Sequence, residues 1–198
     1  MNTPRTVELA HVAAQPDQFP RDGRPEIALL GRSNVGKSSL LNALLGRPSL
    51  ARVSKDPGRT RQIHFYLLDE RYYLVDLPGY GYAKISRDVR EGWKQLVRGY
   101  LERAPDPLVL ALQLIDVRHE PMKVDHEIGE LLAEREVPTG IVLTKADKVS
   151  GSKVSRSAAA VRRAFGLPPD TLIAATSSVT GSGVRQLRTL LGHVFEAE

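Results

Sequence analysis

The stretch that decides the fold is GRSNVGKSS, Gly31 to Ser39, which lies between the apolar runs EIALL (26–30) and LLNALL (40–45). It fits the pattern G-x-x-x-x-G-K-[ST], whose fixed positions are Gly31, Gly36, Lys37 and Ser38. In this pattern glycines let the backbone wrap an anion, the lysine adds charge, and the hydroxyl reaches Mg²⁺. A turn between a strand and a helix can use glycine without binding anything. The complete pattern, with an apolar run on each side, nevertheless predicts a phosphate-binding loop.

Apolar runs and amphipathic segments alternate along the rest of the chain. Strands are predicted at the short apolar runs 26–30, 63–69, 72–76, 108–116, 139–145 and 172–176. Helices are predicted where apolar residues recur every three or four positions, at 40–45, 89–101, 124–132, 152–165 and 184–194. Strands that alternate with helices build βαβ units. The sequence therefore predicts an α/β fold with a mostly parallel central sheet and helices on both faces.

Length and composition favour one globular unit. The chain has 198 residues, 41% of them hydrophobic, which is enough for one substantial core. We assign residues 25–198 to a single domain and 1–24 to an N-terminal extension whose order the sequence leaves open. Cysteine is absent, which excludes disulfides and cysteine-bound metals and allows a cytosolic setting. No apolar stretch is long enough to span a membrane and no signal-peptide core is visible, so a soluble, cytoplasmic protein is expected.

Two further motifs follow predicted strands. DLPG (Asp76–Gly79) places a carboxylate where it can hold a Mg²⁺-bound water, and a glycine whose N–H can meet a γ-phosphate. TKAD (Thr144–Asp147) places a second carboxylate at another strand end, where it can accept hydrogen bonds from the N1–H and amine of guanine. Adenine offers no such pair of donors. A surface ion pair between Lys145 and Asp147 is the alternative, but the order of the three motifs favours guanine.

These motifs, together with PGRTRQIHFY (57–66), DLPGYGYAK (76–84) and TSSVTGSG (176–183), resemble the EngB-type ribosome-assembly GTPases. This group lies in the translation-factor-related branch of the P-loop GTPases, and the resemblance covers about residues 26–195. DLPGYGYA is its most specific part. The resemblance implies the fold of a GTPase domain, a GTP site on a mixed sheet, hydrolysis of GTP to GDP and phosphate, and a late role in large ribosomal subunit assembly.

The resemblance also implies roles for individual residues. The phosphates would be held by Gly31, Arg32, Ser33, Asn34, Val35, Gly36, Lys37, Ser38 and Ser39. Other nucleotide contacts would come from Gly58, Arg59, Thr60, Asp76, Leu77, Pro78 and Gly79. Mg²⁺ would be bound by Ser38 and Thr60, and by Asp76 through water. The base would be read by Thr144, Lys145, Ala146, Asp147, Thr176, Ser177 and Ser178. The residues expected to act in hydrolysis are Lys37, Thr60, Gly79 and Asn34.

Two departures from the commonest GTPase pattern affect affinity and rate. Thr144 stands where many relatives have asparagine, and its shorter side chain cannot make both contacts of an amide, which predicts only micromolar nucleotide affinity. Tyr80 directly follows D-x-x-G, where Ras-like switches carry a water-orienting glutamine. Slow intrinsic hydrolysis is therefore expected, and stimulation by potassium or by the ribosome would raise it.

Two groups could take over the role of that glutamine. Asn34 matches the position that helps hold a monovalent cation near the β- and γ-phosphates in potassium-stimulated GTPases, so we favour K⁺ as a further cofactor. Arg59 or Arg61 could instead act in cis on the same charge. An interpretation of Asn34 as a side chain that only stabilises the loop also stays open.

Charge suggests the partner. The net charge is +5, and basic residues recur near the predicted site at Arg47, Arg52, Lys55, Arg59, Arg61, Lys84, Arg87 and Arg90. A second basic cluster comprises Lys153, Arg156, Arg162 and Arg163, whereas 116–136 is acidic. Solvated surface is the plainer interpretation of such clusters. We favour a surface that meets ribosomal RNA when a γ-phosphate orders residues 47–61 and 79–90. Tyr80 and Tyr82 could stack on bases or pack in the core, and Trp93 is expected in the core.

The expected partner is thus the large ribosomal subunit precursor with its rRNA. Neither DNA specificity nor a membrane partner is expected, and the protein is expected to be a monomer off the ribosome. A protein-binding regulatory GTPase is the alternative, although no lipidation cysteine is present at the C-terminus. A P-loop kinase is a third class, but it has no need of a guanine-reading TKAD motif.

Overall fold

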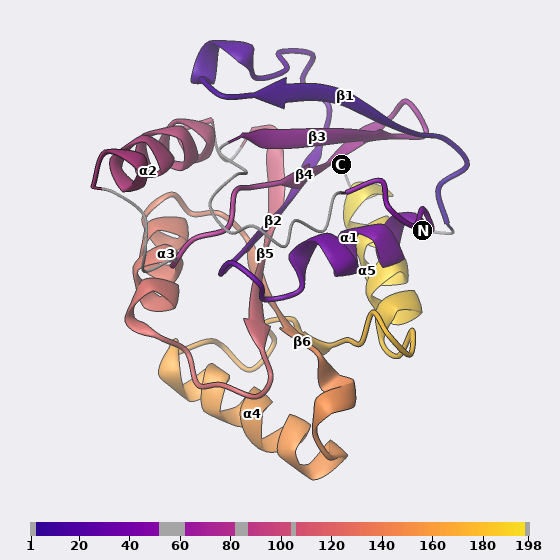
Figure 1. Cartoon of the computed structure of the whole chain (residues 1–198), viewed down its shortest axis with the longest axis vertical. Coiled ribbons are helices and arrows are strands. Elements are labelled where there is room, and N and C mark those ends of the chain that lie inside the picture. The colour runs from indigo at the N-terminus through magenta and orange to yellow at the C-terminus, as the bar shows by residue number, and fades with distance from the viewer. Residues whose placement is uncertain (1–2, 52–61, 82–86, 104–105, 197–198) are drawn as a thin grey trace.

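The computed structural model describes residues 3–51, 62–81, 87–103 and 106–196, with the backbone alone at 87–90 (Figure 1). These residues form a seven-stranded sheet in the order β1-β3-β4-β2-β5-β6-β7. The strands are β1 (Val7–Ala13), β2 (Glu26–Gly31), β3 (Ile63–Leu68), β4 (Tyr72–Asp76), β5 (Leu108–Asp116), β6 (Thr139–Thr144) and β7 (Ile173–Ala175). β3 is antiparallel to β1 and to β4, and the other pairs are parallel. The predicted α/β fold with a mostly parallel sheet is confirmed.

Helices cover both faces of the sheet, as predicted. One face carries α1 (Lys37–Leu45) and α5 (Val184–Glu196) (Figure 1). The other carries α2 (Arg87–Leu101), α3 (Lys123–Glu134) and α4 (Gly151–Ala164). The central strand β2 shows why both faces are covered. Its side chains alternate between the two cores, with Ile27 in the α1–α5 core and Ala28 in the α2–α3 core, and every residue of the strand is buried.

Residues 1–24, to which no strand was assigned from the sequence, contribute the edge strand β1 and the short 3-10 helix η1 (Pro16–Gln18). The register of β1 with β3 shifts between Leu9 and His11. Only Ala13 of this strand is fully buried. Because β1 lies at an edge and is largely exposed, its sequence lacks the apolar run or alternation that marks a strand.

The parallel part of the sheet determines where a ligand can bind. β2, β4, β5 and β6 run in the same direction, so their carboxyl ends meet at one edge. The last residues of these strands are Gly31, Asp76, Asp116 and Thr144. All three predicted motifs therefore lie at the edge where open α/β sheets bind their ligands.

A buried polar cluster attaches the first residue of β2 to the C-terminal end of α2, far from the ligand edge of the sheet. Glu26, which is 1% exposed, accepts hydrogen bonds from Arg103 Nη2 at 2.8 Å and from the Tyr100 hydroxyl at 2.7 Å. Burial raises the pKa of Glu26, although Arg103 and Tyr100 act in the opposite direction. The cluster thus keeps a carboxylate in the core by giving each oxygen a donor.

Arg103→Ala is expected to destabilise the protein by about 3 kcal/mol at neutral pH, because it leaves the Glu26 carboxylate buried without its cation. The loss should grow between pH 5 and pH 8. Removing Arg103 raises the folded pKa of Glu26 further above its unfolded value near about 4.3, so the folded state holds the proton and stability falls as pH rises. Urea unfolding at the two pH values measures this difference.

The matched control is Arg135→Ala, which breaks the exposed pair of Arg135 with Glu102 at 3.4 Å. An exposed pair contributes little, so the control should change stability by less than about 1 kcal/mol at either pH. A loss in Arg103→Ala that is the same at pH 5 and pH 8 would contradict the assignment to Glu26.

Candidate functional site

The loop between β2 and α1 turns tightly at the edge of the sheet. Asn34 and Gly36 both have left-handed backbone conformations, with φ of 64° and 106°. Glycine adopts such a conformation without cost, and asparagine is among the residues that tolerate it best. α1 begins at Lys37, directly after the loop. The N–H groups of its first turn therefore have no carbonyl partner within the helix and are suited to binding an anion.

The D-x-x-G segment lies beside this loop. The Tyr80 N–H donates to the Gly31 carbonyl at 3.2 Å, and the Ser33 N–H donates to the Tyr80 carbonyl at 2.9 Å. A Cβ atom on Gly79 would lie 3.2 Å from the backbone N of Ser33. A side chain there would force the segment away from the loop, so the close approach explains why glycine occupies this position.

Lys37 and Asp76 form a buried ion pair that joins the start of α1 to the end of β4. Their side chains are only 10% and 7% exposed. Charges removed from water to this extent need an oppositely charged partner, and here Lys37 and Asp76 are partners of each other. The structure thus brings together the cation predicted for the phosphates and the carboxylate predicted for the metal. Ser38, the predicted metal ligand, is the next residue of α1.

The TKAD motif is connected directly to the same loop. The Thr144 hydroxyl donates to the Val35 carbonyl at 2.7 Å, and the Ile115 carbonyl lies 3.3 Å from the same oxygen. The Lys145 ammonium donates to the Asn34 carbonyl at 2.7 Å. These contacts mean that the segment predicted to read the base also fixes the shape of the segment predicted to hold the phosphates.

Asp147, the predicted guanine acceptor, lies beside the loop that follows β7. Its carboxylate accepts a hydrogen bond from Ser177 Oγ at 2.7 Å and lies 3.0 Å from Lys148 Nζ. These partners hold the pKa of Asp147 below its usual range, so the group is an anionic acceptor at neutral pH. The Ser177 N–H already donates to Ser182 O at 2.9 Å. The exposed Ser178 is therefore the better-placed N–H donor for a base carbonyl. Ala146 donates its N–H to Thr176 O at 3.0 Å.

Asp116 and Arg118 belong to the site, although the sequence indicated only that Asp116 ends a strand at 108–116 and that both lie in the acidic stretch 116–136. Asp116 Oδ2 lies 3.0 Å from Lys145 Nζ and 2.7 Å from Arg118 Nη2. Burial acts to raise the pKa of Asp116, but hydrogen bonds from Arg118 and Lys145 hold it well below its usual range. Asp116 thereby fixes Lys145 in place. The sequence shows Asp116 only as the end of a predicted strand, and its pairing with Thr144 across β5 and β6 appears only in the fold.

His64 is a second residue near the site that the sequence did not indicate. It pairs in register with Asp76 across β3 and β4. Its Nδ1 is buried and has no hydrogen-bond partner among the residues that the structure describes. Burial lowers the pKa of His64, which favours the neutral ring beside the Lys37–Asp76 pair. The five histidines share no spacing, so nothing in the sequence distinguishes this one.

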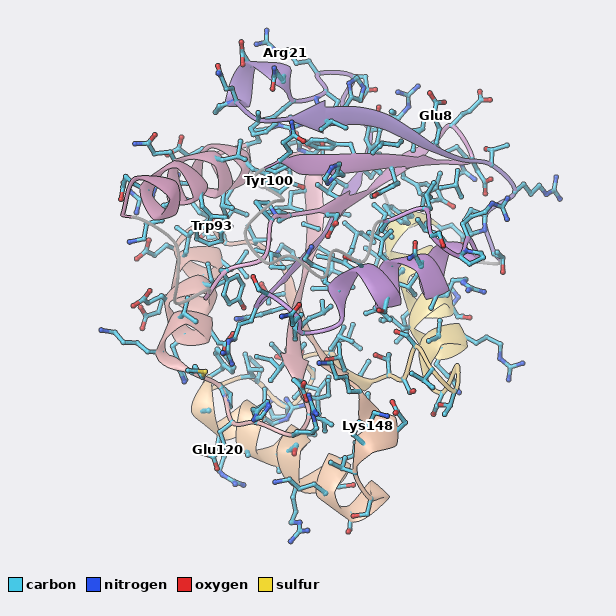
Figure 2. All side chains as sticks on the ribbon, viewed as in Figure 1. Glu8, Arg21, Trp93, Tyr100, Glu120 and Lys148 are labelled. Carbon is cyan, nitrogen blue, oxygen red and sulfur yellow. The ribbon has the colours of Figure 1, made fainter. Side chains whose placement is uncertain are left out.

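Tyr80 is a core residue, 3% exposed, and not a surface group. Its hydroxyl donates to Asp125 Oδ1 at 2.9 Å and accepts from Gln113 Nε2 at 3.3 Å. Burial, followed by the charge of Asp125, raises the pKa of Tyr80, so the phenol stays neutral. Trp93 packs against the ring, is half-buried, and donates from Nε1 to the Pro78 carbonyl at 2.9 Å. Figure 2 shows it between α2 and α3.

Several predicted residues lie outside the described part of the chain. They are Arg52, Lys55, Gly58, Arg59, Thr60, Arg61, Tyr82 and Lys84. The side chains of Arg87 and Arg90 are also outside it. Their predicted contacts to phosphate, magnesium or RNA stay predictions.

The parallel sheet, the loop ahead of α1 and the two carboxylate motifs at one edge define a P-loop GTPase. A sequence model of the family described as "50S ribosome-binding GTPase" matches residues 26–145. A probable GTP-binding protein EngB from Alkaliphilus metalliredigens is 40% identical over 191 residues, which cover 96% of this chain and 91% of that protein. Another, from Thermotoga maritima, is 46% identical over 192 residues, 97% of each chain.

The fold comparison agrees. A crystal structure of a probable GTP-binding protein engB superposes with a TM-score of 0.73 at 24% identity, and the match covers 87% of this chain and all of that one. The chain belongs to the EngB family of GTP-binding proteins. In the described part of the chain, none of the helices is both long and apolar enough to cross a membrane.

Thr144→Val is expected to weaken nucleotide binding about fivefold, which corresponds to about 1 kcal/mol. The substitution keeps the shape of the side chain but leaves the Val35 carbonyl without its donor, so the phosphate loop is held less firmly. Isothermal titration with GDP measures the effect. The unsubstituted protein is expected to bind in the micromolar range, and sub-nanomolar affinity would contradict our interpretation of Thr144.

Thr139→Val is the matched control, because Thr139 lies at the other end of β6 and its hydroxyl donates to the Val137 carbonyl at 2.9 Å. It removes a comparable hydrogen bond far from the loop. Its GDP affinity should equal that of the unsubstituted protein. If both variants lose affinity equally, the effect of Thr144→Val is a general loss of stability.

Proposed function

We propose that the protein binds GTP with Mg²⁺, hydrolyses it to GDP and phosphate, and acts as a nucleotide-dependent switch in assembly of the large ribosomal subunit. The observation that carries this proposal is the match of residues 26–145 to a family described as 50S ribosome-binding GTPases. The convergence of the three motifs at one edge of the sheet supports the nucleotide part. We further propose that the protein is a cytoplasmic monomer when it is not bound to the ribosome.

GTP would change the partners of the Lys37–Asp76 pair. The Lys37 ammonium would turn to phosphate oxygens, Asp76 would hold a metal-bound water, and the Ser38 hydroxyl would bind Mg²⁺ directly. These are the oxygen donors that Mg²⁺ prefers. The described residues contain no group of three acidic or histidine side chains that could hold a metal alone, which suits an ion that also uses phosphate and water. Bound Mg²⁺ would neutralise charge on the phosphates.

The γ-phosphate would be sensed by the backbone of Gly79. This glycine already lies against Ser33 of the phosphate loop, so a small displacement would bring its N–H to a phosphate oxygen. The same displacement would pull on Pro78 and Tyr80, which are hydrogen-bonded to Trp93 and Asp125. A change of nucleotide would in this way change the positions of α2 and α3.

Hydrolysis would need a group other than the residue after D-x-x-G. The Tyr80 hydroxyl is occupied by Asp125 and Gln113 and is buried, so it cannot orient an attacking water. The Asn34 side chain is exposed and makes no hydrogen bond to the described residues, which weakens the interpretation that it only stabilises the loop. It is free to help bind K⁺ close to the phosphates, where the cation would offset developing charge.

Ribosomal RNA would meet a cationic face on α4. Lys153, Arg156 and Arg163 are exposed, and none pairs with a carboxylate of the described residues. Arg162 differs, because its guanidinium is hydrogen-bonded to the carbonyls of Pro168 and Thr171. Unpaired cations on one helix attract phosphates without sequence preference. Arg47 is also exposed, but it follows the end of α1 and donates from Nη2 to the Arg5 carbonyl at 3.1 Å, so it lies away from the phosphate loop.

The initial rate of GTP hydrolysis should be at least about tenfold higher in KCl than in NaCl at equal ionic strength, because a fixed cation stabilises charge on the γ-phosphate. Asn34→Gly should abolish the difference while it keeps the left-handed backbone that position 34 requires. Equal rates in the two salts would exclude K⁺. A loss of activity in Arg59→Ala would then identify the arginine instead.

Co-sedimentation with large ribosomal subunits tests the proposed function. More protein should pellet with a non-hydrolysable GTP analogue than with GDP or without nucleotide, and rising salt should reduce the amount steeply. Lys153→Glu with Arg156→Glu should weaken the association. The control is Arg5→Glu with Arg21→Glu, which makes the same change of charge at exposed positions remote from α4. Absence of any subunit binding in all three nucleotide states would refute the ribosomal role.

A further inference from the structure

Residues of α2, α3 and the D-x-x-G segment line a groove of about 730 Å³. Figure 1 shows α2 and α3 as neighbouring helices on one side of the sheet. The floor of the groove is apolar. Val97 and Ile128 are buried there, and Val124 and Leu131 are half-buried and reach the surface. Gly79–Gly81 closes the inner end. The groove therefore adjoins the segment that would sense the γ-phosphate, but it does not include any of the predicted phosphate, metal or base ligands other than Gly79.

The α3 wall of the groove is acidic. Glu127, Glu130 and Glu134 are spaced three and four residues apart, so they share one face of the helix, and all three are exposed. Lys123 lies 4.0 Å from Glu127. No cation among the described side chains lies within ion-pair distance of Glu130 or Glu134.

The α2 wall does not neutralise these carboxylates. It contributes Glu91, Lys94 and Arg98, all exposed, so the described side chains that line the groove include four carboxylates and two cations. Neither Lys94 nor Arg98 forms an ion pair with α3 in the described part of the chain. The groove is thus locally acidic on a protein whose net charge is +5.

We propose that this groove binds an amphipathic, basic polypeptide helix of a partner protein. Apolar side chains on one face of that helix would cover the half-buried Trp93, Val124 and Leu131, and lysine or arginine side chains would pair with Glu130 and Glu134. This is the helix-in-groove mode of recognition, with an apolar floor for affinity and charged rims for specificity. Phosphates of RNA are disfavoured here, because the carboxylates of α3 repel them.

Both walls of the groove are tied to the D-x-x-G segment. On the α2 side Trp93 Nε1 donates to the Pro78 carbonyl at 2.9 Å, and at the start of α3 Asp125 accepts from the Tyr80 hydroxyl at 2.9 Å. A displacement of this segment would therefore change the distance between the walls. This coupling rests on the proposed function, whereas the groove and its charge do not. We expect the partner helix to bind one nucleotide state more tightly than the other.

The probe is a fluorescent 18-residue amphipathic helix built from leucine and lysine, compared with its leucine–glutamate counterpart by anisotropy. The lysine peptide should bind the protein and the glutamate peptide should not. Because the whole protein is basic, non-specific attraction cannot explain that preference. Glu130→Lys with Glu134→Lys should weaken lysine-peptide binding at least about tenfold. The control, Glu8→Lys with Asp170→Lys, makes the same change of charge at exposed positions outside the groove and should leave binding unchanged.

Equal binding by the groove variant and the unsubstituted protein would overturn the proposal, as would equal binding of the lysine and glutamate peptides. Each titration is repeated with GDP and with a non-hydrolysable GTP analogue, and at least about a threefold difference is expected. Equal affinity in the two states would overturn the coupling to nucleotide alone. Subunit co-sedimentation of the Glu130→Lys, Glu134→Lys variant separates the two proposals, because the ribosomal role can stand when the peptide fails to bind.

Discussion

The site depends on a buried ion pair between Lys37 and Asp76. The pair requires β2 and β4 to be neighbours, because only then does the start of α1 lie next to the end of β4. Either charge would be strongly destabilising if it were buried without the other. The pair therefore holds the start of α1 and the end of β4 together. If the protein binds nucleotide as proposed, phosphate oxygens would replace Asp76 as the partner of Lys37, and a metal-bound water would replace Lys37 as the partner of Asp76.

Much of this architecture could be predicted from the sequence, for a physical reason. β2 and β5 are buried on both faces, so each shows a continuous apolar run in the sequence. The phosphate-loop pattern of Gly31 to Ser38 predicts a strand before it and a helix after it. β1 could not be predicted because an exposed edge strand needs no apolar pattern. The roles of Asp116 and His64 could not be predicted either. They depend on which strands are neighbours, and spacing along the chain does not contain that information.

A polar cluster replaces a simple apolar core beneath the D-x-x-G segment. Tyr80, Asp125 and Gln113 are each at most 3% exposed, yet their side chains hydrogen-bond to one another. Such groups are costly in a core unless every one has a partner, so the cluster permits few other arrangements of the segment. The hydrogen bonds of the Tyr80 hydroxyl therefore fix the geometry of the D-x-x-G segment.

The cations of α4 and the carboxylates of the α2–α3 groove form regions of opposite charge on one side of the molecule. A polyanion that approaches from solution would exert a torque on it, turning the cationic helix toward the phosphates before contact and the carboxylates of α3 away from them. Encounters would then be oriented rather than random. Contact through α4 would leave the α2–α3 groove uncovered, because the groove lies on the other side of α3 from α4 (Figure 1).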